Sequence, residues 1–223
     1  MNEISKMFDI NELKFLNSEK YKEIKPEGEV SIKEAKDFIN SLFVDKIDIK
    51  SNDNQYDIDL DDKSCFYDDN NNLYRKGNTL IENNKYEING YRYATDDIGR
   101  IDYVEWKLYL KERENRLSIK DSIEDIGKGY EQKGDDRGHI IGDRFNGSNG
   151  LENIIPQDAN INRIDYKNFE NQLADEIKNG KEVYLKNELL YEENSRRPYA
   201  LLVTYTIDNV ENFRIFPNDF KEI

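Results

Sequence analysis

The spacing of hydrophobic and polar residues changes along the chain, and each spacing predicts a different element. In residues 31–43, apolar side chains recur every three or four positions behind a Ser-x-x-Glu capping sequence, which predicts a helix. Pro26 and Gly28 separate this segment from an earlier one of the same character. We therefore interpret residues 1–45 as a helical N-terminal appendage.

From residue 46 onward, apolar and polar side chains alternate in short runs, as in strands with one exposed face. Turn-forming residues join these runs, and Asn-Gly in particular favours a two-residue hairpin. The predicted strands are 66–67, 73–74, 85–88, 91–93 and 101–106. The turns between them include 68–72 and Asn89-Gly90. The pattern predicts an antiparallel sheet built from hairpins.

The second half of the chain combines a short strand pattern with a long helical one. The charged segment 107–134 is linker-like, and we expect it to be partly helical from Leu108 to Ile123. The apolar run after His139 places this histidine near the start of a strand. An apolar stripe then predicts a helix, with members Tyr166, Phe169, Leu173 and Ile177. The residues expected to bound it are Asp158 or Asn160 and Asn179-Gly180.

Composition excludes several classes of protein. No run approaches the ~20 apolar residues of a membrane helix, and the N-terminus lacks the basic-then-apolar pattern of a secretory signal. The only cysteine, Cys65, forbids an internal disulfide, and we expect it to pack as a small hydrophobic residue. One cysteine and one histidine cannot form a zinc finger.

The net charge of −14 argues against nucleic-acid binding, because such proteins usually carry a positive field. More than half of the excess, −8, falls in residues 1–70. The remainder of the chain is closer to balance, so a local basic groove is compatible with the composition. We expect weak non-specific binding with a strong dependence on salt.

The single histidine ends the sequence Asp136-Arg137-Gly138-His139, and an arginine two residues before a histidine is typical of a phosphodiester site. Two further pieces follow it, Asn153-x-x-Pro156-Gln157 and Asn162-(x)7-Glu170. On a helix of 3.6 residues per turn, Asn162 and Glu170 lie about 80° apart. Both can therefore line the flank where this helix packs on the histidine strand.

These pieces resemble the signature of the DNA/RNA non-specific endonucleases, the ββα-metal or His-Me finger nucleases. The resemblance covers about residues 85–220, and residues 93–100 are similar to bacterial type VII-secreted and polymorphic toxin nucleases. It implies an α+β fold with a central antiparallel β-sheet, helices and a ββα-metal motif. We expect the nuclease domain to span 46–223, with the motif at about 130–180.

The resemblance also implies roles for individual residues. His139 would be the general base, and Asn162 the single direct protein ligand of Mg²⁺, with Mn²⁺ as the alternative ion. Glu170 would order metal-bound waters, and Arg137 would contact phosphate or support the site. The candidates for a further substrate-binding arginine are Arg100, Arg144 and Arg163.

One stretch departs from the family pattern. The family follows the metal-binding asparagine with Gln-Gly-Ala-Trp, and here the sequence is 163–166, Arg-Ile-Asp-Tyr. Tyr166 keeps an aromatic residue at the packing position, Arg163 can reach phosphate, and Asp165 adds negative charge beside it. Arg196 and Arg197 precede a predicted strand and either flank a nucleic-acid groove or end that strand.

The leading hypothesis is a metal-dependent endonuclease that cleaves DNA, with RNA as a second substrate, and acts as an antibacterial toxin. The resemblance implies a cognate immunity protein, no membrane partner, and secretion by a signal-peptide-independent route or delivery into a target-cell cytoplasm. The acidity motivates an alternative, a catalytically inactive nuclease-fold module acting as a DNA mimic or decoy. A metal-free ribonuclease is a third option. The sequence does not indicate an oligomeric state.

Overall fold

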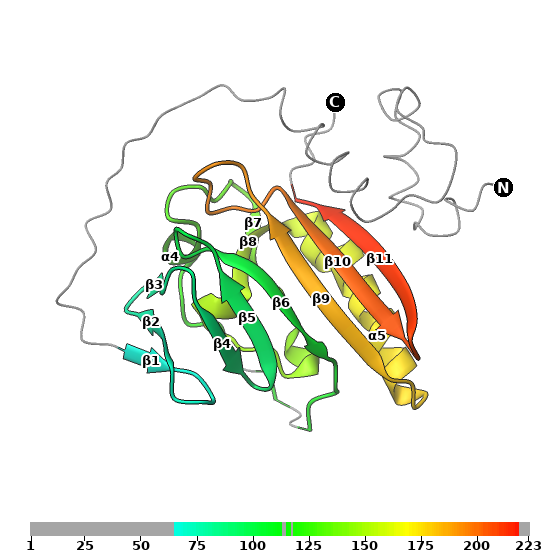
Figure 1. The fold of residues 1–223 in the computed structure, drawn as a ribbon. Helices are drawn as coiled ribbons and strands as arrows, with labels where there is room; N and C mark the ends of the chain where they lie inside the picture. Colours follow the sequence, from blue (N-terminus) through cyan, green and yellow to red (C-terminus); the bar gives the residue numbers. More distant parts are fainter. Residues whose placement is uncertain (1–64, 113–114, 117, 219–223) are drawn as a thin grey trace. The chain divides into compact units, whose positions relative to one another are not determined.

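A six-stranded antiparallel sheet is the frame of the part of the chain that the computed structural model describes, residues 65–112, 115–116 and 118–218 (Figure 1). In spatial order its strands are β11 (Val210–Pro217), β10 (Ala200–Ile207), β9 (Val183–Leu190), β6 (Ile101–Lys107), β5 (Tyr91–Thr95) and β4 (Lys85–Ile88). The expectation of an α+β fold with a central antiparallel sheet is confirmed. The predicted helical appendage, residues 1–45, lies outside the described residues.

The hairpins of the first half follow the sequence pattern. Asn89 and Gly90 have φ angles of 54° and 75°, as the two-residue turn between β4 and β5 requires. A smaller sheet contains β1 (Cys65–Tyr67), β2 (Leu73–Lys76) and β3 (Thr79–Leu80). Cys65 is exposed, so the expectation that it packs in the interior is wrong. It lies on the edge strand β1, which has no buried position.

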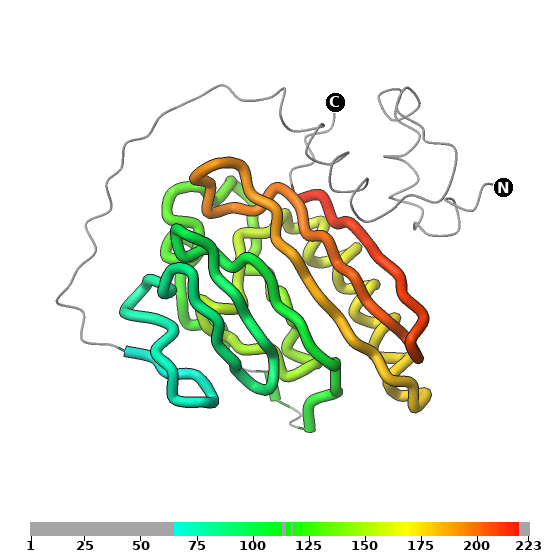
Figure 2. Tube along the Cα trace, viewed as in Figure 1, coloured from blue at the N-terminus to red at the C-terminus, as the bar shows by residue number. Residues whose placement is uncertain are grey.

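The chain leaves the sheet after β6, passes behind it and returns as β9, as the trace in Figure 2 shows. This excursion contains the hairpin of β7 (Asp135–His139) and β8 (Ile154–Asp158), followed by a helix. The helix begins with a π-helical turn, η4 (Ile161–Tyr166), and continues as α5 (Lys167–Lys178). Strand, strand and helix thus follow one another, as the resemblance implies.

Helix α5 lies behind the sheet and buries the predicted apolar stripe against it (Figure 1). The Phe169 ring packs edge-on against Tyr205 of β10 at 5.1 Å and lies 5.4 Å from Phe216 of β11. Asp158 Oδ1 accepts the backbone N–H groups of residues 160 and 161, which caps the helix start. Gly180, with φ of 83°, follows its last turn.

Two predictions for the middle of the chain are wrong. No described residue from 108 to 122 is helical, and the helix α4 is confined to Ile123–Gly127, where Ser122 caps it. Backbone bonds hold the earlier residues instead, from Leu108 N to Val183 O and from Lys111 N to Arg144 O. The remaining helical turns are η2 (Asp143–Phe145) and η3 (Leu151–Asn153). The described helices include none long and apolar enough to span a bilayer.

The second wrong prediction concerns His139, which ends strand β7 rather than beginning one. The apolar residues after it are buried but do not extend the ladder. Ile140 N still bonds to Asn153 O, and the Asn153 side chain then takes both backbone groups of Ile141, accepting from its N–H and donating to its C=O. The Asn153 side chain therefore makes the two hydrogen bonds that the next residue of a paired strand would make.

Candidate active site

His139 lies at the end of β7 with 7% of its surface exposed. Its Nε2 is 2.8 Å from Asn149 Oδ1. An amide oxygen can only accept, so Nε2 carries the proton and Nδ1 is the basic nitrogen of the neutral ring. Asn153, fully buried, holds the loop that bears Asn149 by donating to Ser148 O. Asn149 thus holds the orientation of the ring, and the proton lies on Nε2 as long as the amide oxygen faces it.

Gly138 is required by a close approach within the hairpin. A Cβ at this position would come within 2.1 Å of Gln157 Oε1, because the buried Gln157 side chain lies against the Gly138 backbone. Neither the oxygen nor the nitrogen of that amide hydrogen-bonds to a described residue. A larger residue before His139 would displace Gln157 or the strand itself.

Asp136 joins the hairpin to the first turn of the helix. Its Oδ2 accepts from Asn162 Nδ2 at 3.0 Å, and Arg163 binds both carboxylate oxygens at 2.7 and 2.6 Å. Burial disfavours the charge on Asp136, but the bonds from Arg163 and Asn162 outweigh it and lower the pKa. Because a carboxylate accepts only, the Asn162 NH2 group faces Asp136 and Oδ1 faces away from it.

Glu170 lies in a half-buried site beside the loop that follows β7. Burial raises its pKa to about 7, opposed by the positive charges of Arg144 and Arg116 and by a bond from Gly142 N. A Cβ on Gly142 would lie 2.0 Å from Glu170 Oε1, so only glycine leaves room for the carboxyl group. Glu170 therefore changes its charge near neutral pH.

The π-helical turn changes the predicted relation between Asn162 and Glu170. In a turn closed by i→i+5 bonds, each residue advances by less than the ~100° of an α-helix. Four of the eight steps from Asn162 to Glu170 lie in η4. Their separation around the axis is therefore well below the ~80° predicted for a straight α-helix. Both side chains lie on nearly the same side of the helix.

The predicted arginines are distributed among several partners. Arg137 donates to the carbonyls of Ile119 and Asp121 at 3.3 and 3.1 Å, and Arg144 bonds to Asn171. Arg100 bonds to Asp96 at 2.6 Å in the turn between β5 and β6. The structure brings Asn162 and Arg163 together on Asp136, and it places the charge of Arg144 near Glu170.

Asn218 closes the far side of the hairpin, although no sequence pattern identified it. Its fully buried side chain accepts from Asp158 N at 2.8 Å and donates to the carbonyls of Pro156 and Pro198. Asp136, Asn149 and Asn218 were all missed as site-building residues. Asp136 belongs to the Asp-Arg-Gly-His motif and could have been found there, whereas the other two depend on tertiary contacts.

The oxygen donors present suit a hard cation that retains most of its waters. Within the described ranges, no cluster of three or more His, Cys, Asp or Glu side chains could enclose a metal. Asn162 Oδ1, oriented by Asp136, is a neutral oxygen donor of the kind that Mg²⁺ and Mn²⁺ accept. The residues present therefore fit a weakly held, mainly hydrated ion.

Comparison with known proteins identifies the family of the chain. A model of the family described as DNA/RNA non-specific endonuclease matches residues 82–209. Type VII secretion system protein EssD of Staphylococcus aureus, from strains USA300 and NCTC 8325, is 33% identical over 137 residues, covering 56% of this chain. The match spans 21% of the length of those relatives. A solved structure of Sda1 nuclease with bound zinc ion is similar over 39% of each chain, at 23% identity and a TM-score of 0.36.

Proposed function

The chain belongs to the DNA/RNA non-specific endonuclease family, and we therefore propose that it hydrolyses phosphodiester bonds of DNA, and of RNA as a second substrate, in a metal-dependent reaction. The observation that carries this proposal is the arrangement on β7. His139 is oriented at its end, and Asp136, three residues earlier, orients Asn162. One short motif thus carries the proposed base and also orients the proposed metal ligand.

In this proposal each residue has a separate task. His139 Nδ1 takes a proton from the attacking water while Asn149 holds Nε2. Asn162 would hold Mg²⁺, or Mn²⁺, through Oδ1, and the bound ion supplies stabilisation of negative charge on the leaving oxygen. Glu170 accepts hydrogen bonds from waters near Asn162 once it is ionised. Arg137, which is exposed, contacts a substrate phosphate or supports the site.

The comparison with EssD supports a biological role for this activity. We propose that the chain is the nuclease part, residues 46–223, of an antibacterial toxin, with residues 1–45 as an appendage. A cognate immunity protein would then block the site in the producing cell. Export would follow a signal-peptide-independent route, or the protein would be delivered into the cytoplasm of a target cell. The name of this relative, type VII secretion system protein EssD, motivates the proposed role as an exported toxin.

Plasmid digestion tests the proposal directly. Wild type should nick and linearise DNA with Mg²⁺ or Mn²⁺ and lose activity in EDTA, whereas His139→Ala should be inactive under all conditions. A parallel assay on single-stranded RNA compares the substrates. Activity that survives EDTA would favour a metal-free ribonuclease. If wild type and variant are equally inert but bind DNA-binding proteins, the inactive decoy becomes the better description.

A further inference from the structure

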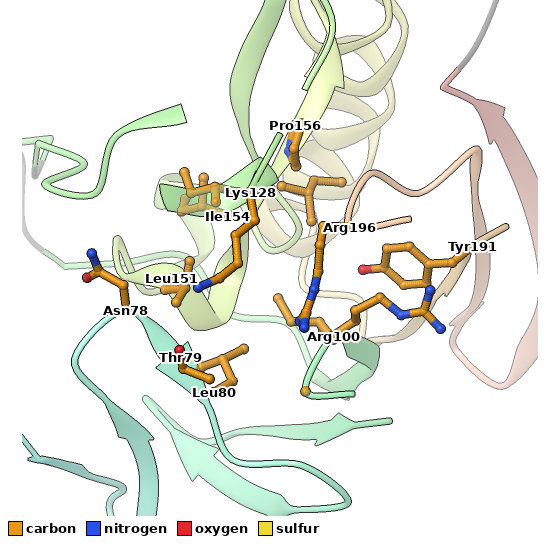
Figure 3. A pocket seen from close by; sticks show the side chains of 14 residues that line it. Asn78, Thr79, Leu80, Arg100, Lys128, Leu151, Ile154, Pro156, Tyr191 and Arg196 are labelled. Atoms are coloured by element: carbon orange, nitrogen blue, oxygen red, sulfur yellow. The ribbon is translucent and has the colours of Figure 1, made fainter. Parts of the chain in front are cut away.

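A small cavity lies beside the β7–β8 hairpin, and three cationic residues from different segments line it, with the Arg100 guanidinium turned toward Tyr191 (Figure 3). Its volume is about 40 Å³, room for about three waters at ~10–15 Å³ each. Arg100 comes from the turn between β5 and β6, Lys128 from the end of α4, and Arg196 from the segment between β9 and β10. Leu151 and Ile154 contribute to an apolar wall.

The cations at this cavity are only partly compensated, by Asp96 and Glu82 near Arg196 and by Asp125 near Lys128, which lie outside its lining. No carboxylate is among its lining residues in the described part of the chain. Burial and the charge of Arg100 lower the pKa of Arg196, and burial and the charge of Arg196 lower the pKa of Lys128. Arg196 forms neither a hydrogen bond nor an ion pair with another described residue. Half-buried like charges destabilise the fold unless an anion joins them.

The segment that carries Arg196 is held rigidly on both sides. Arg100 donates from Nη1 to the carbonyl of Ser195 at 2.9 Å. Arg197 forms a bidentate ion pair with Asp135 of β7, with both distances 2.8 Å and both side chains almost fully buried. The Arg196 guanidinium therefore enters the cavity from a fixed backbone, so little conformational entropy is lost on binding.

The cavity borders the strands of the candidate active site. Ile154 and Pro156 of β8 line it, and these residues pair directly with His139 and Arg137 of β7. Directly paired residues in antiparallel strands have Cα atoms about 5 Å apart. A ligand in the cavity would therefore lie next to a nucleic-acid strand engaged by His139.

We propose that this cavity binds a phosphate group through Lys128 and Arg196, with Arg100 behind them. Guanidinium groups bind phosphate oxygens in pairs, and the volume admits a tetrahedral oxyanion but no nucleobase. The source is a phosphodiester of bound nucleic acid next to the scissile one, or free inorganic phosphate. The first of these sources, a phosphodiester of bound nucleic acid, rests on the proposed nuclease function. In a chain with a net charge of −14, such a site would concentrate attraction at one point.

Isothermal titration of the full chain with inorganic phosphate, in EDTA and at constant ionic strength, tests the site without catalysis. Wild type should bind, and Arg196→Gln and Lys128→Gln should each bind about tenfold more weakly. Arg92→Gln is the matched control, because Arg92 stacks on Trp106 at 3.8 Å outside the cavity. No binding by wild type, or variants indistinguishable from the control, would overturn the proposal. Thermal unfolding without phosphate should show both variants folded and no less stable, since a like charge is removed.

Cleavage kinetics identify the source of the phosphate. If it belongs to the substrate, the Arg196→Gln and Lys128→Gln variants should raise KM about tenfold with little change in kcat, and each should reduce the salt slope by about one. If they lose phosphate binding but keep the KM of wild type, the ligand is free phosphate and the site stands. If wild type binds phosphate but cleaves nothing, the proposed nuclease function fails and the phosphate site survives.

Discussion

Two clusters border the β7–β8 hairpin, one built on carboxylates that have cationic partners and the other on cationic side chains. One contains Asp136 and Glu170 around the oxygen donor Asn162, and its carboxylates have lowered and raised pKa values respectively. The other contains Lys128 and Arg196 around a cavity without a lining carboxylate. The first suits a hydrated cation and the second an oxyanion. In the proposed nuclease, the first would act on the scissile phosphodiester and the second on a phosphate next to it.

The clusters also differ in how the fold holds them. Asp136 is satisfied by two partners, so the carboxylate cluster is complete before any ligand arrives. Arg196 has no comparable partner among the described residues, so the cationic cluster gains most from a ligand. The difference indicates that substitutions on the carboxylate side should act on metal binding and chemistry. Substitutions on the cationic side should act on substrate affinity.

The largest effect is expected for His139→Ala, which removes the proposed base from the chemistry and leaves both clusters intact. Activity on plasmid DNA should fall by about 10²–10⁴, the usual contribution of a general base. Binding of Mn²⁺, followed by electron paramagnetic resonance, should be unchanged, because the proposal makes the histidine a base and not a ligand. A variant that keeps a tenth of the activity, or loses the metal, would contradict the assignment.

The second largest effect is expected for Asp136→Asn, which should weaken metal binding at Asn162. An asparagine at 136 no longer forces the Asn162 NH2 group toward it, so Oδ1 loses its fixed orientation. We expect Mn²⁺ affinity to fall about 10–100-fold, as for other residues that orient a ligand. The matched control is Arg163→Gln, which removes the other partner of Asp136 and keeps the Asn162 bond. Equal losses in both variants would mean that the ion pair between Asp136 and Arg163, and not the bond to Asn162, is responsible.

Glu170→Gln should remove a pH dependence of stability. The folded-state pKa, about 7, lies above the ordinary 4.5, so the unfolded chain releases this proton first and stability falls as pH rises from about 4.5 to 7. The variant should gain on the order of 3 kcal/mol relative to wild type between pH 4.5 and pH 8. Urea unfolding in EDTA measures this, with the exposed Glu182→Gln as control. A parallel pH profile for wild type and Glu170→Gln would refute it.

The smallest effect is expected for Arg163→Gln on folding stability. The Arg163 side chain is 69% exposed, so its ion pair with Asp136 is screened by water. The free energy of unfolding should change by less than about 1 kcal/mol. Chemical denaturation measures the change. A loss of several kcal/mol would show that Arg163 supports the first turn of the helix.

The sequence predicted those features that depend on neighbours along the chain. The Asn89-Gly90 hairpin follows from turn chemistry, and the stripe through Phe169 follows from helical period. The position of His139 at a strand end did not follow, because the Asn153 side chain replaces a strand pair for Ile141. An apolar run cannot reveal that its backbone bonds go to a side chain twelve residues away.

The candidate site could be predicted as a set of residues but not as a set of contacts. The motif identified Asn162, whereas its orientation depends on Asp136, 26 positions earlier. The π-helical turn brings Glu170 toward the same side of the helix as Asn162, and the periodic pattern of the sequence does not predict this turn. The cavity at Arg196 requires three distant segments to meet, so no local pattern indicates it.

The buried side chain of Asn218 has a consequence for the timing of synthesis. It hydrogen-bonds to Asp158 and Pro156 of β8. The hairpin that carries His139 therefore lacks these bonds until residue 218 has been made. At ~5–20 residues per second, a ribosome needs several seconds to travel from the histidine codon to that point. A nascent chain therefore holds an incomplete site during this interval. For a nuclease, this delay would limit damage to nucleic acid close to the ribosome that makes it.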